Sequence, residues 1–109
     1  MSSPDFDSDV EESVESDILE EEDIDEPSMY RVMLHNDDYT PMEFVVEILM
    51  FVFNKTTDEA MQITLSVHRN GIGVCGVYTW EIAETKVETV AGLAGESGYP
   101  LKCSVEEDK

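Results

Sequence analysis

Apolar and polar side chains alternate along the stretch from Met29 to His35. One set of alternate positions holds Tyr30, Val32 and Leu34, and the other holds Arg31, Met33 and His35. A period of two is typical of a strand with one face against a core. We therefore expect a half-buried strand here.

The spacing of apolar residues then changes to that of a helix, and the change coincides with start signals. Thr40 is expected to cap the helix, Pro41 suits the first helical position, and Glu43 completes a capping box. The helix is expected to run to about Asn54. Its inward positions are Val45, Val46, Leu49 and Phe53.

A second helix is predicted from another capping box, formed by Thr56 and Glu59. It is expected to end near Asn70-Gly71, because glycine commonly follows the last turn of a helix. One face of this helix carries Ala60, Ile63, Thr64 and Val67.

The rest of the chain predicts a strand, a helix and a strand. Gly73 to Tyr78 is apolar and β-branched, and Pro100 to Val105 alternates. Between them Thr79 is expected to cap a third helix, whose apolar positions are Trp80, Ala83, Val87, Val90 and Leu93. The order β-α-α-β-α-β, with no internal repeat, predicts an α+β domain with helices packed on one face of a small sheet.

Charge divides the 109-residue chain into two parts. The formal net charge is −20, of which residues 1–28 contribute −13 through 13 acidic and no basic side chains. Such a segment buries too little apolar surface to offset its ordering entropy. We expect residues 1–27 to be a disordered acidic tail and residues 28–109 to be one folded domain. The tail is either a solubilising segment or an arm that contacts a partner.

The same composition excludes several classes of function. A strongly acidic chain lacks the basic face that nucleic acid or an anionic membrane requires. No apolar run reaches the length of a membrane span, and the acidic N-terminus is unlike a signal peptide, so a cytoplasmic protein is expected. Cys75 and Cys103 form no C-x-x-C pair and are expected to be reduced core thiols.

No motif for catalysis or for a cofactor is present in the sequence. There is no phosphate loop, no dinucleotide-binding turn and no serine nucleophile elbow. The acidic cluster at Asp37 and Asp38 lacks the glycine and the closing glutamate of a calcium loop. His35 and His68 lie 33 residues apart, so a zinc site is not expected. We therefore expect no metal, no cofactor and no enzymatic activity.

Asn36, Asp37 and Asp38 form an unusually polar link between the first strand and the first helix, where a turn needs only one such residue. A neutral imidazole, an amide oxygen and carboxylates all accept hydrogen bonds from an ammonium group, so His68 is a candidate companion. Beside apolar residues, this set suits capture of a peptide N-terminus. A structural turn with a structural histidine remains open, as does acid–base chemistry by His68 with an aspartate. The surrounding small or apolar candidates are Met42, Val45, Thr64, Val67 and Leu101.

Three strings carry a resemblance to a known family: "YRVMLHNDDYTPMEFVVEIL", "VHRNGIGVCGVYTWEIAETKV" and "YPLKCSVEEDK". Over about residues 28–109 the chain resembles ClpS, the adaptor that delivers N-degron substrates to a ClpA-type AAA+ unfoldase and its ClpP peptidase. The resemblance implies a three-stranded antiparallel sheet packed with three helices. It also implies that the acidic tail engages the unfoldase during handover.

The resemblance also implies roles for individual residues. Asn36 and His68 would bind the substrate's α-ammonium group directly, Asp38 would assist through water, and Asp37 would contact the peptide backbone. Met42 would act as a gate against β-branched side chains. Glu81 and Lys86 would dock on the N-terminal domain of the unfoldase. The side-chain pocket would be lined by Thr40, Met42, Val45, Val67 and Leu101, with Thr64 beside them.

One residue of the pocket departs from the family pattern. Well-known members carry a methionine where this chain has Thr64. Threonine is shorter, so we expect a roomier pocket that discriminates less strongly against isoleucine and valine.

The sequence therefore predicts a non-enzymatic adaptor, expected to be a monomer, that binds free N-terminal Leu, Phe, Tyr or Trp residues. One alternative is a docking domain of a AAA+ chaperone without a substrate pocket. The other is a small hydrolase that uses Asp38 and His68.

Overall fold

The computed structural model describes residues 27–109, so the predicted acidic tail lies almost entirely outside the described residues. The element order is β-α-α-β-α-β, as predicted. The strands are β1 (Met29–His35), β2 (Ile72–Tyr78) and β3 (Lys102–Asp108). The helices are α2 (Met42–Phe51), α3 (Thr57–Asn70) and α4 (Trp80–Ser97).

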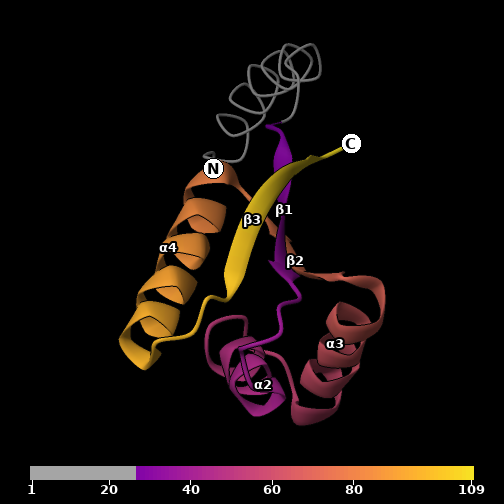
Figure 1. The fold of residues 1–109 in the computed structure, drawn as a ribbon. Helices are drawn as coiled ribbons and strands as arrows, with labels where there is room; N and C mark the ends of the chain where they lie inside the picture. The colour runs from indigo at the N-terminus through magenta and orange to yellow at the C-terminus, as the bar shows by residue number, and fades with distance from the viewer. Residues whose placement is uncertain (1–26) are drawn as a thin grey trace, which may run out of the picture.

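The three strands form one antiparallel sheet in the order β2-β1-β3 (Figure 1). Helix α4 packs along β1 and β3, α3 packs against β2, and α2 packs against α3. Strand β1 is therefore central, and its C-terminal end points at the part of the molecule that contains α2 and α3 (Figure 1).

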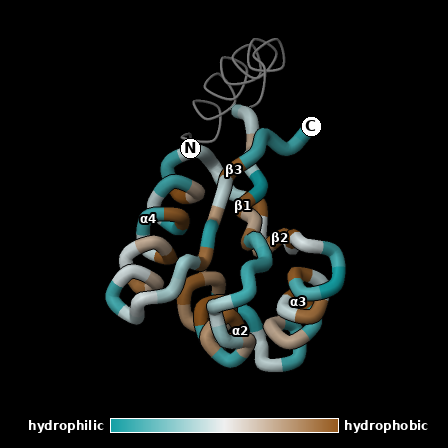
Figure 2. The backbone as a smooth tube through the Cα atoms, in the orientation of Figure 1, coloured by the Kyte–Doolittle hydropathy of each residue, from teal (hydrophilic) through white to brown (hydrophobic). Residues whose placement is uncertain are grey.

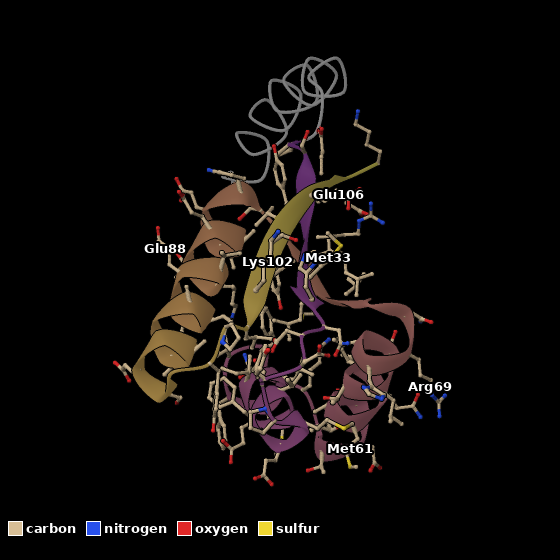
Figure 3. All side chains as sticks on the ribbon, viewed as in Figure 1. Met33, Met61, Arg69, Glu88, Lys102 and Glu106 are labelled. Atoms are coloured by element: carbon tan, nitrogen blue, oxygen red, sulfur yellow. The ribbon has the colours of Figure 1, made fainter. Side chains whose placement is uncertain are left out.

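The core lies between the sheet and the helices, and apolar positions of α2 and α4 turn toward it (Figure 2). Burying this set from water stabilises the fold, since each large apolar side chain contributes roughly 1.5–3 kcal/mol. Polar side chains such as Glu88 of α4 and Arg69 of α3 point outward (Figure 3). The core comprises Val32, Leu34, Val45, Ile48, Leu49, Val52, Phe53, Ala60, Val67, Cys75, Ala83, Val90, Ala94 and Leu101.

Strand β1 is more buried than its alternation predicts. Met33 alternates with the buried residues Val32 and Leu34, yet only 8% of it is exposed. Because β1 is the central strand, Met33 has a neighbour on each side, Val74 of β2 and Ser104 of β3. Cross-strand neighbours cover a mid-strand side chain even on the face without helices.

The start of α2 differs from the prediction. Helix α2 begins at Met42, its N-cap residue is Pro41, and no side chain caps it. The Thr40 hydroxyl donates instead to Asp37 Oδ2 at 2.7 Å, so the predicted capping box with Glu43 does not form. The capping rule considers only the residues from Thr40 onward, so it does not include Asp37 as a competing partner for the Thr40 hydroxyl. The helix also ends at Phe51, short of Asn54.

The capping box of α3 is confirmed. The Thr56 side chain accepts from Glu59 N–H at 3.1 Å, and Glu59 Oε1 accepts from Thr56 N–H at 3.0 Å. This second hydrogen bond is the main reason that the pKa of Glu59 lies below its ordinary value. The helix ends at Asn70 with Gly71 as its left-handed C-cap, as predicted.

The remaining elements differ from the prediction mainly at their ends. Thr79 is the N-cap of α4, but its side chain makes no capping hydrogen bond. Of the apolar positions predicted for α4, Trp80 and Leu93 are exposed. Ala94, which was not among those positions, is buried. Strand β3 begins two residues later than predicted and runs to Asp108, where Arg31 pairs with Glu106 and Asp108 across the strands.

Both cysteines are free thiols. Cys75 is buried and Cys103 is partly buried. Burial raises the pKa of Cys103 to about 12 and raises that of Cys75 further, with Cys103 adding to the effect on Cys75. Protonated, shielded thiols react slowly, which agrees with the expected structural role. No helix within residues 27–109 combines the length and apolarity needed to cross a membrane.

Candidate functional site

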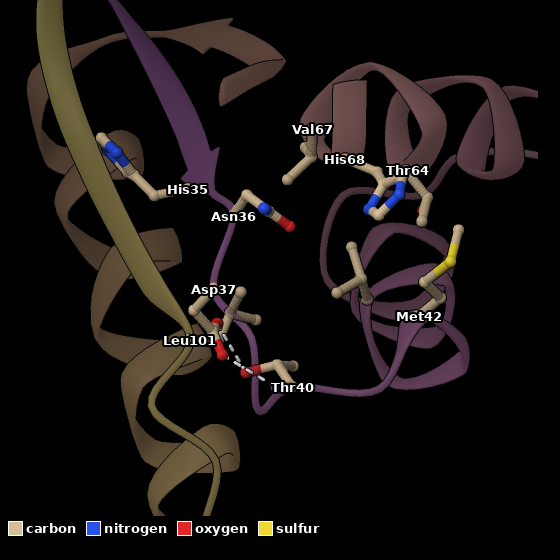
Figure 4. A pocket seen from close by; sticks show the side chains of 10 residues that line it. His35, Asn36, Asp37, Thr40, Met42, Thr64, Val67, His68 and Leu101 are labelled. Carbon is tan, nitrogen blue, oxygen red and sulfur yellow. Dashed lines mark hydrogen bonds between the residues drawn. The ribbon is translucent and has the colours of Figure 1, made fainter. Parts of the chain in front are cut away.

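A small pocket lies where the C-terminal end of β1 meets α2 and α3 (Figure 4). The centre of a water molecule can reach only about 20 Å³ of this pocket. The lining residues are His35, Asn36, Asp37, Thr40, Met42, Val45, Thr64, Val67, His68 and Leu101. The structure thus brings together ten residues from three separate segments of the chain, residues 35–45, residues 64–68 and Leu101.

The polar side of the pocket is carried by Asn36 and His68. The amide of Asn36 points from the end of β1 toward the helix that carries His68 (Figure 4). Their relative position is set by the backbone, because Asn36 N–H donates to Gly71 O at 3.0 Å and Gly71 N–H donates to Val67 O at 2.9 Å. These two hydrogen bonds connect the end of β1 to the last turn of α3.

A second glycine sets the distance between α3 and the sheet. A Cβ atom added to Gly73 would lie 2.6 Å from Val67 Cγ2, which is too close for two carbon atoms. Gly73 is buried and pairs with Leu34 of β1. Glycine at this position therefore allows α3 to approach β2 closely enough for Val67 to form the pocket wall.

Asp37 organises the loop between β1 and α2. Its Oδ1 accepts from Tyr39 N–H at 2.7 Å and from Thr40 N–H at 2.8 Å. Partial burial disfavours the charged form of Asp37. The hydrogen bonds from the Thr40 hydroxyl and from the two N–H groups outweigh this effect, so the pKa lies below its ordinary value of 3.8. Asp37 is therefore a firmly ionised carboxylate, and its Oδ2 has only one partner.

The apolar side of the pocket combines two helices with the residue before β3. Val45, Val67 and Leu101 are each less than 9% exposed. Met42 is 46% exposed and stands at the edge, across from Thr64 (Figure 4). Thr64 is 3% exposed, and its hydroxyl donates to Ala60 O at 2.7 Å within α3. Because this hydrogen bond satisfies the hydroxyl donor of Thr64, a ligand in the pocket need not offer it an acceptor.

Most residues predicted for the site line this one pocket, with two differences. Asp38 is exposed and is not among the lining residues. His35 lines the pocket although no role was predicted for it. Its ring lies on the opposite side of the strand from Asn36, and its Nε2 is 2.6 Å from Ser104 Oγ (Figure 4). This contact between His35 and Ser104 could not be predicted from the sequence, because it depends on the pairing of β1 with β3.

Glu81 and Lys86 lie elsewhere, on α4. They line a separate surface hollow together with residues of the C-terminal end of α2. Within residues 27–109, no three His, Cys, Asp or Glu side chains gather closely enough to hold a metal ion.

Comparisons with known proteins identify one family. The model for "ATP-dependent Clp protease adaptor protein ClpS" matches residues 25–104. The ClpS adapter protein of Nitratidesulfovibrio vulgaris is 61% identical over 93 residues, which cover 85% of this chain and 89% of that protein. The ClpS adapter protein of Lawsonia intracellularis is 56% identical over 98 residues, which cover 90% of each chain. The structure of Agrobacterium tumefaciens ClpS2 bound to L-phenylalaninamide matches with a TM-score of 0.74 and 41% identity, covering 76% of this chain and all of that one.

Proposed function

The chain belongs to the ClpS family of adaptor proteins of the ATP-dependent Clp protease, and from this premise we propose that it is an N-degron adaptor. It binds the free N-terminal residue of a substrate when that residue is Leu, Phe, Tyr or Trp. It then delivers the substrate to a ClpA-type unfoldase for degradation by ClpP. The observation that carries the proposal is the pairing of hydrogen-bond acceptors with an apolar wall in one pocket.

The polar groups suit a charged amine. The side-chain oxygen of Asn36 and an unprotonated ring nitrogen of His68 are acceptors, and the Asp37 carboxylate adds negative charge beside them. The exposed Asp38 carboxylate is close in sequence and acts on the ammonium group through water. L-Phenylalaninamide, the molecule in the Agrobacterium structure, joins a free amine to a benzyl group, the combination that such a pocket would accept.

The apolar groups suit one bulky side chain, provided that Met42 moves. The 20 Å³ that the centre of a water molecule can reach is far below the roughly 150 Å³ of an apolar cavity that binds benzene. Met42 is half exposed, and methionine is a flexible side chain that adapts to irregular spaces. Rotation of Met42 therefore admits the side chain, and Met42 then covers it.

The energies are sufficient for capture followed by release. Burial of a Leu or Phe side chain contributes roughly 1.5–3 kcal/mol. Hydrogen bonds to a charged group contribute about 1.5–3 kcal/mol each. One side chain and three such bonds give roughly 6–12 kcal/mol before ordering costs, and micromolar affinity needs about 8 kcal/mol.

Delivery involves two further parts of the chain. Glu81 and Lys86 on α4 belong to the surface that docks on the unfoldase, well separated in sequence from the pocket residues. We propose that residues 1–27, with their acidic side chains, form a distinct tail that engages the unfoldase during handover. The adaptor binds its substrate without chemical change and acts as a monomer in the cytoplasm.

Alanine substitutions at Asn36 and His68 test the amine-binding role. Each should weaken binding of a Leu-initiated peptide at least about tenfold, because the loss of one hydrogen bond to a charged group costs about 1.5–3 kcal/mol. Glu81→Ala is the matched control and should leave peptide affinity unchanged. Peptide affinity that survives both pocket substitutions would contradict the assignment of Asn36 and His68 as acceptors for the ammonium group.

A further inference from the structure

Two aromatic rings join α2 to the segment that connects α4 with β3. The ring centroids of Phe44 in α2 and Tyr99 in that segment lie 4.9 Å apart, and the ring planes meet at 66°, which is an edge-to-face contact. The segment passes beside α2 in the fold (Figure 1). Neither ring lines the pocket of Figure 4, but each belongs to a stretch of backbone that carries one of its apolar walls.

On the α2 side, that wall is Val45. Val45 directly follows Phe44, is 6% exposed and lines the pocket. Successive residues of a helix point about 100° apart, so one turn of α2 presents Val45 to the pocket and Phe44 to the neighbouring segment. Any shift or rotation of α2 therefore moves the Val45 wall and the Phe44 ring together.

On the other side, the backbone of Tyr99 is fixed by the end of α4. Gly98 takes the left-handed conformation there, with a φ of 78°. Gly98 N–H donates to Gly95 O at 3.2 Å, and Tyr99 N–H donates to Ala94 O at 2.9 Å. These two hydrogen bonds form a Schellman motif, so the chain leaves α4 in a defined direction at Tyr99.

The three residues from Tyr99 to Leu101 form a stiff connection. Pro100 holds its own φ within a narrow range and restricts the backbone of Tyr99 before it. Leu101 follows, is 7% exposed and lines the pocket. Lys102 then pairs with His35 of β1. A displacement of Tyr99 is thus transmitted to Leu101 instead of being absorbed by a flexible loop.

We propose that the contact between Phe44 and Tyr99 sets the distance between the Val45 and Leu101 walls, and that Tyr99 is thereby a positioning residue for selectivity by side-chain size. The inference rests on the proposed function, since it takes the pocket as the site of the substrate's N-terminal side chain. Helix α2 packs against α3, whereas Tyr99 extends from α4, so the two rings bridge the two sides of the pocket. An edge-to-face contact is favourable only while the rings keep their relative position, which suits it to fixing a distance.

The test compares the affinities of the full-length adaptor for peptides that begin with Ala, Leu or Phe, measured by competition against a labelled peptide. Tyr99→Ala should weaken binding of the Leu and Phe peptides about fivefold, because their side chains reach both walls, and should leave the Ala peptide unchanged. Tyr99→Phe keeps the ring and should bind all three peptides as the wild type does. Tyr99 is partly exposed, so the folded state should tolerate both changes.

Trp80→Ala is the matched control. Trp80 makes the same kind of contact with Tyr30, with ring centroids 5.2 Å apart and planes at 67°, and neither of these residues lines the pocket. This variant should keep the wild-type ratio of Phe-peptide to Ala-peptide affinity. An equal loss for all three peptides in Tyr99→Ala would show a general weakening of the fold and would refute the positioning role.

A double variant tests whether Tyr99 acts through Leu101. When Leu101→Ala has already removed the wall, Tyr99→Ala should cause no further loss of Phe-peptide affinity, whereas additive losses would refute this route. If Tyr99→Ala binds the Leu and Phe peptides within about twofold of wild type, the positioning role is refuted while the proposed function stands. If the wild-type adaptor binds none of the peptides, both are refuted.

Discussion

Thr64 is the residue of α3 that lies across the pocket from Met42 (Figure 4). Its hydroxyl is occupied by Ala60 O, so the side chain acts toward the pocket as a small apolar group. Thr64 also lines a neighbouring groove between α2 and α3, where Met42 is again a wall. A short residue here leaves room beside Met42.

We predict that Thr64→Met strengthens discrimination against β-branched N-terminal residues. The longer side chain fills space beside Met42, so affinity for Ile-initiated peptides should fall about tenfold more than affinity for Leu-initiated ones. Leu65→Met is the control, since Leu65 is on the same helix but outside the pocket. Equal losses for both peptides would mean that Thr64 does not determine selectivity.

Asp37 predicts a pH-dependent contribution to stability. Its pKa in the folded chain is below the ordinary value of 3.8, so its stabilising effect is complete above that value. The effect is lost as the pH falls through the lower, folded pKa. Asp37→Asn should therefore be less stable than wild type at pH 7, by a modest amount because the carboxylate is largely solvated.

The difference between the two proteins should shrink below pH 3.8, as urea unfolding at several pH values would reveal. A constant difference from pH 7 to pH 3 would contradict the assigned hydrogen bonds.

Asp37 also explains one failure of prediction at the residue scale. The rule that made Thr40 a helix cap considers only residues inside the helix start, whereas the Thr40 hydroxyl is taken by a carboxylate in the preceding loop.

At the scale of elements, local signals predicted the helices and strands well where nothing competed with them. The Thr56–Glu59 box and the glycine end of α3 formed as expected, because both are complete within the helix itself. The contacts between elements were not predictable in this way. The hydrogen bond between Asn36 N–H and Gly71 O forms only because the end of α3 meets the end of β1. The pattern of apolar and polar residues does not show how close these two ends lie.

Gly73 offers a direct test of how α3 is placed. Gly73→Ala inserts a methyl group against Val67, so α3 must shift away from β2 and carry Val67 and His68 with it. We expect a loss of about 1–3 kcal/mol in the free energy of unfolding and a clear loss of peptide affinity.

Gly92→Ala is the matched control for Gly73→Ala. Gly92 lies in α4 with no atom within 4 Å of an added Cβ, so this change should stabilise the helix by about 0.5–1 kcal/mol. Denaturant unfolding and peptide anisotropy on both variants provide the measurements. Full peptide affinity in Gly73→Ala would show that the pocket does not depend on the close approach of α3.

At the scale of the whole molecule, the predicted α+β class and the antiparallel sheet are confirmed. The strand order β2-β1-β3 was not predicted, because it depends on pairings between distant segments. That order places β1 in the centre, so that its end meets α2 and α3 at the pocket. The division at residues 27 and 28 remains a prediction.

The fold places two recesses of its surface apart from each other. The substrate pocket lies at one end of β1, and the hollow with Phe51 lies between α2 and α4. Helix α2 contributes to both, with Met42 and Val45 at the pocket and Phe51 at its other end. The central claim is that the pocket recognises an amine and a bulky side chain at once.

The most direct test is fluorescence anisotropy with labelled peptides that differ only at the first residue: Leu, Phe, Ile, Ala and acetyl-Leu. The account predicts tight binding of the Leu and Phe peptides, weak binding of the Ala peptide, and none of the acetylated one. Acetylation removes the charge and leaves the acceptors at Asn36 and His68 without donors. Equal binding of Leu and acetyl-Leu peptides, or no binding of any peptide, would contradict the account.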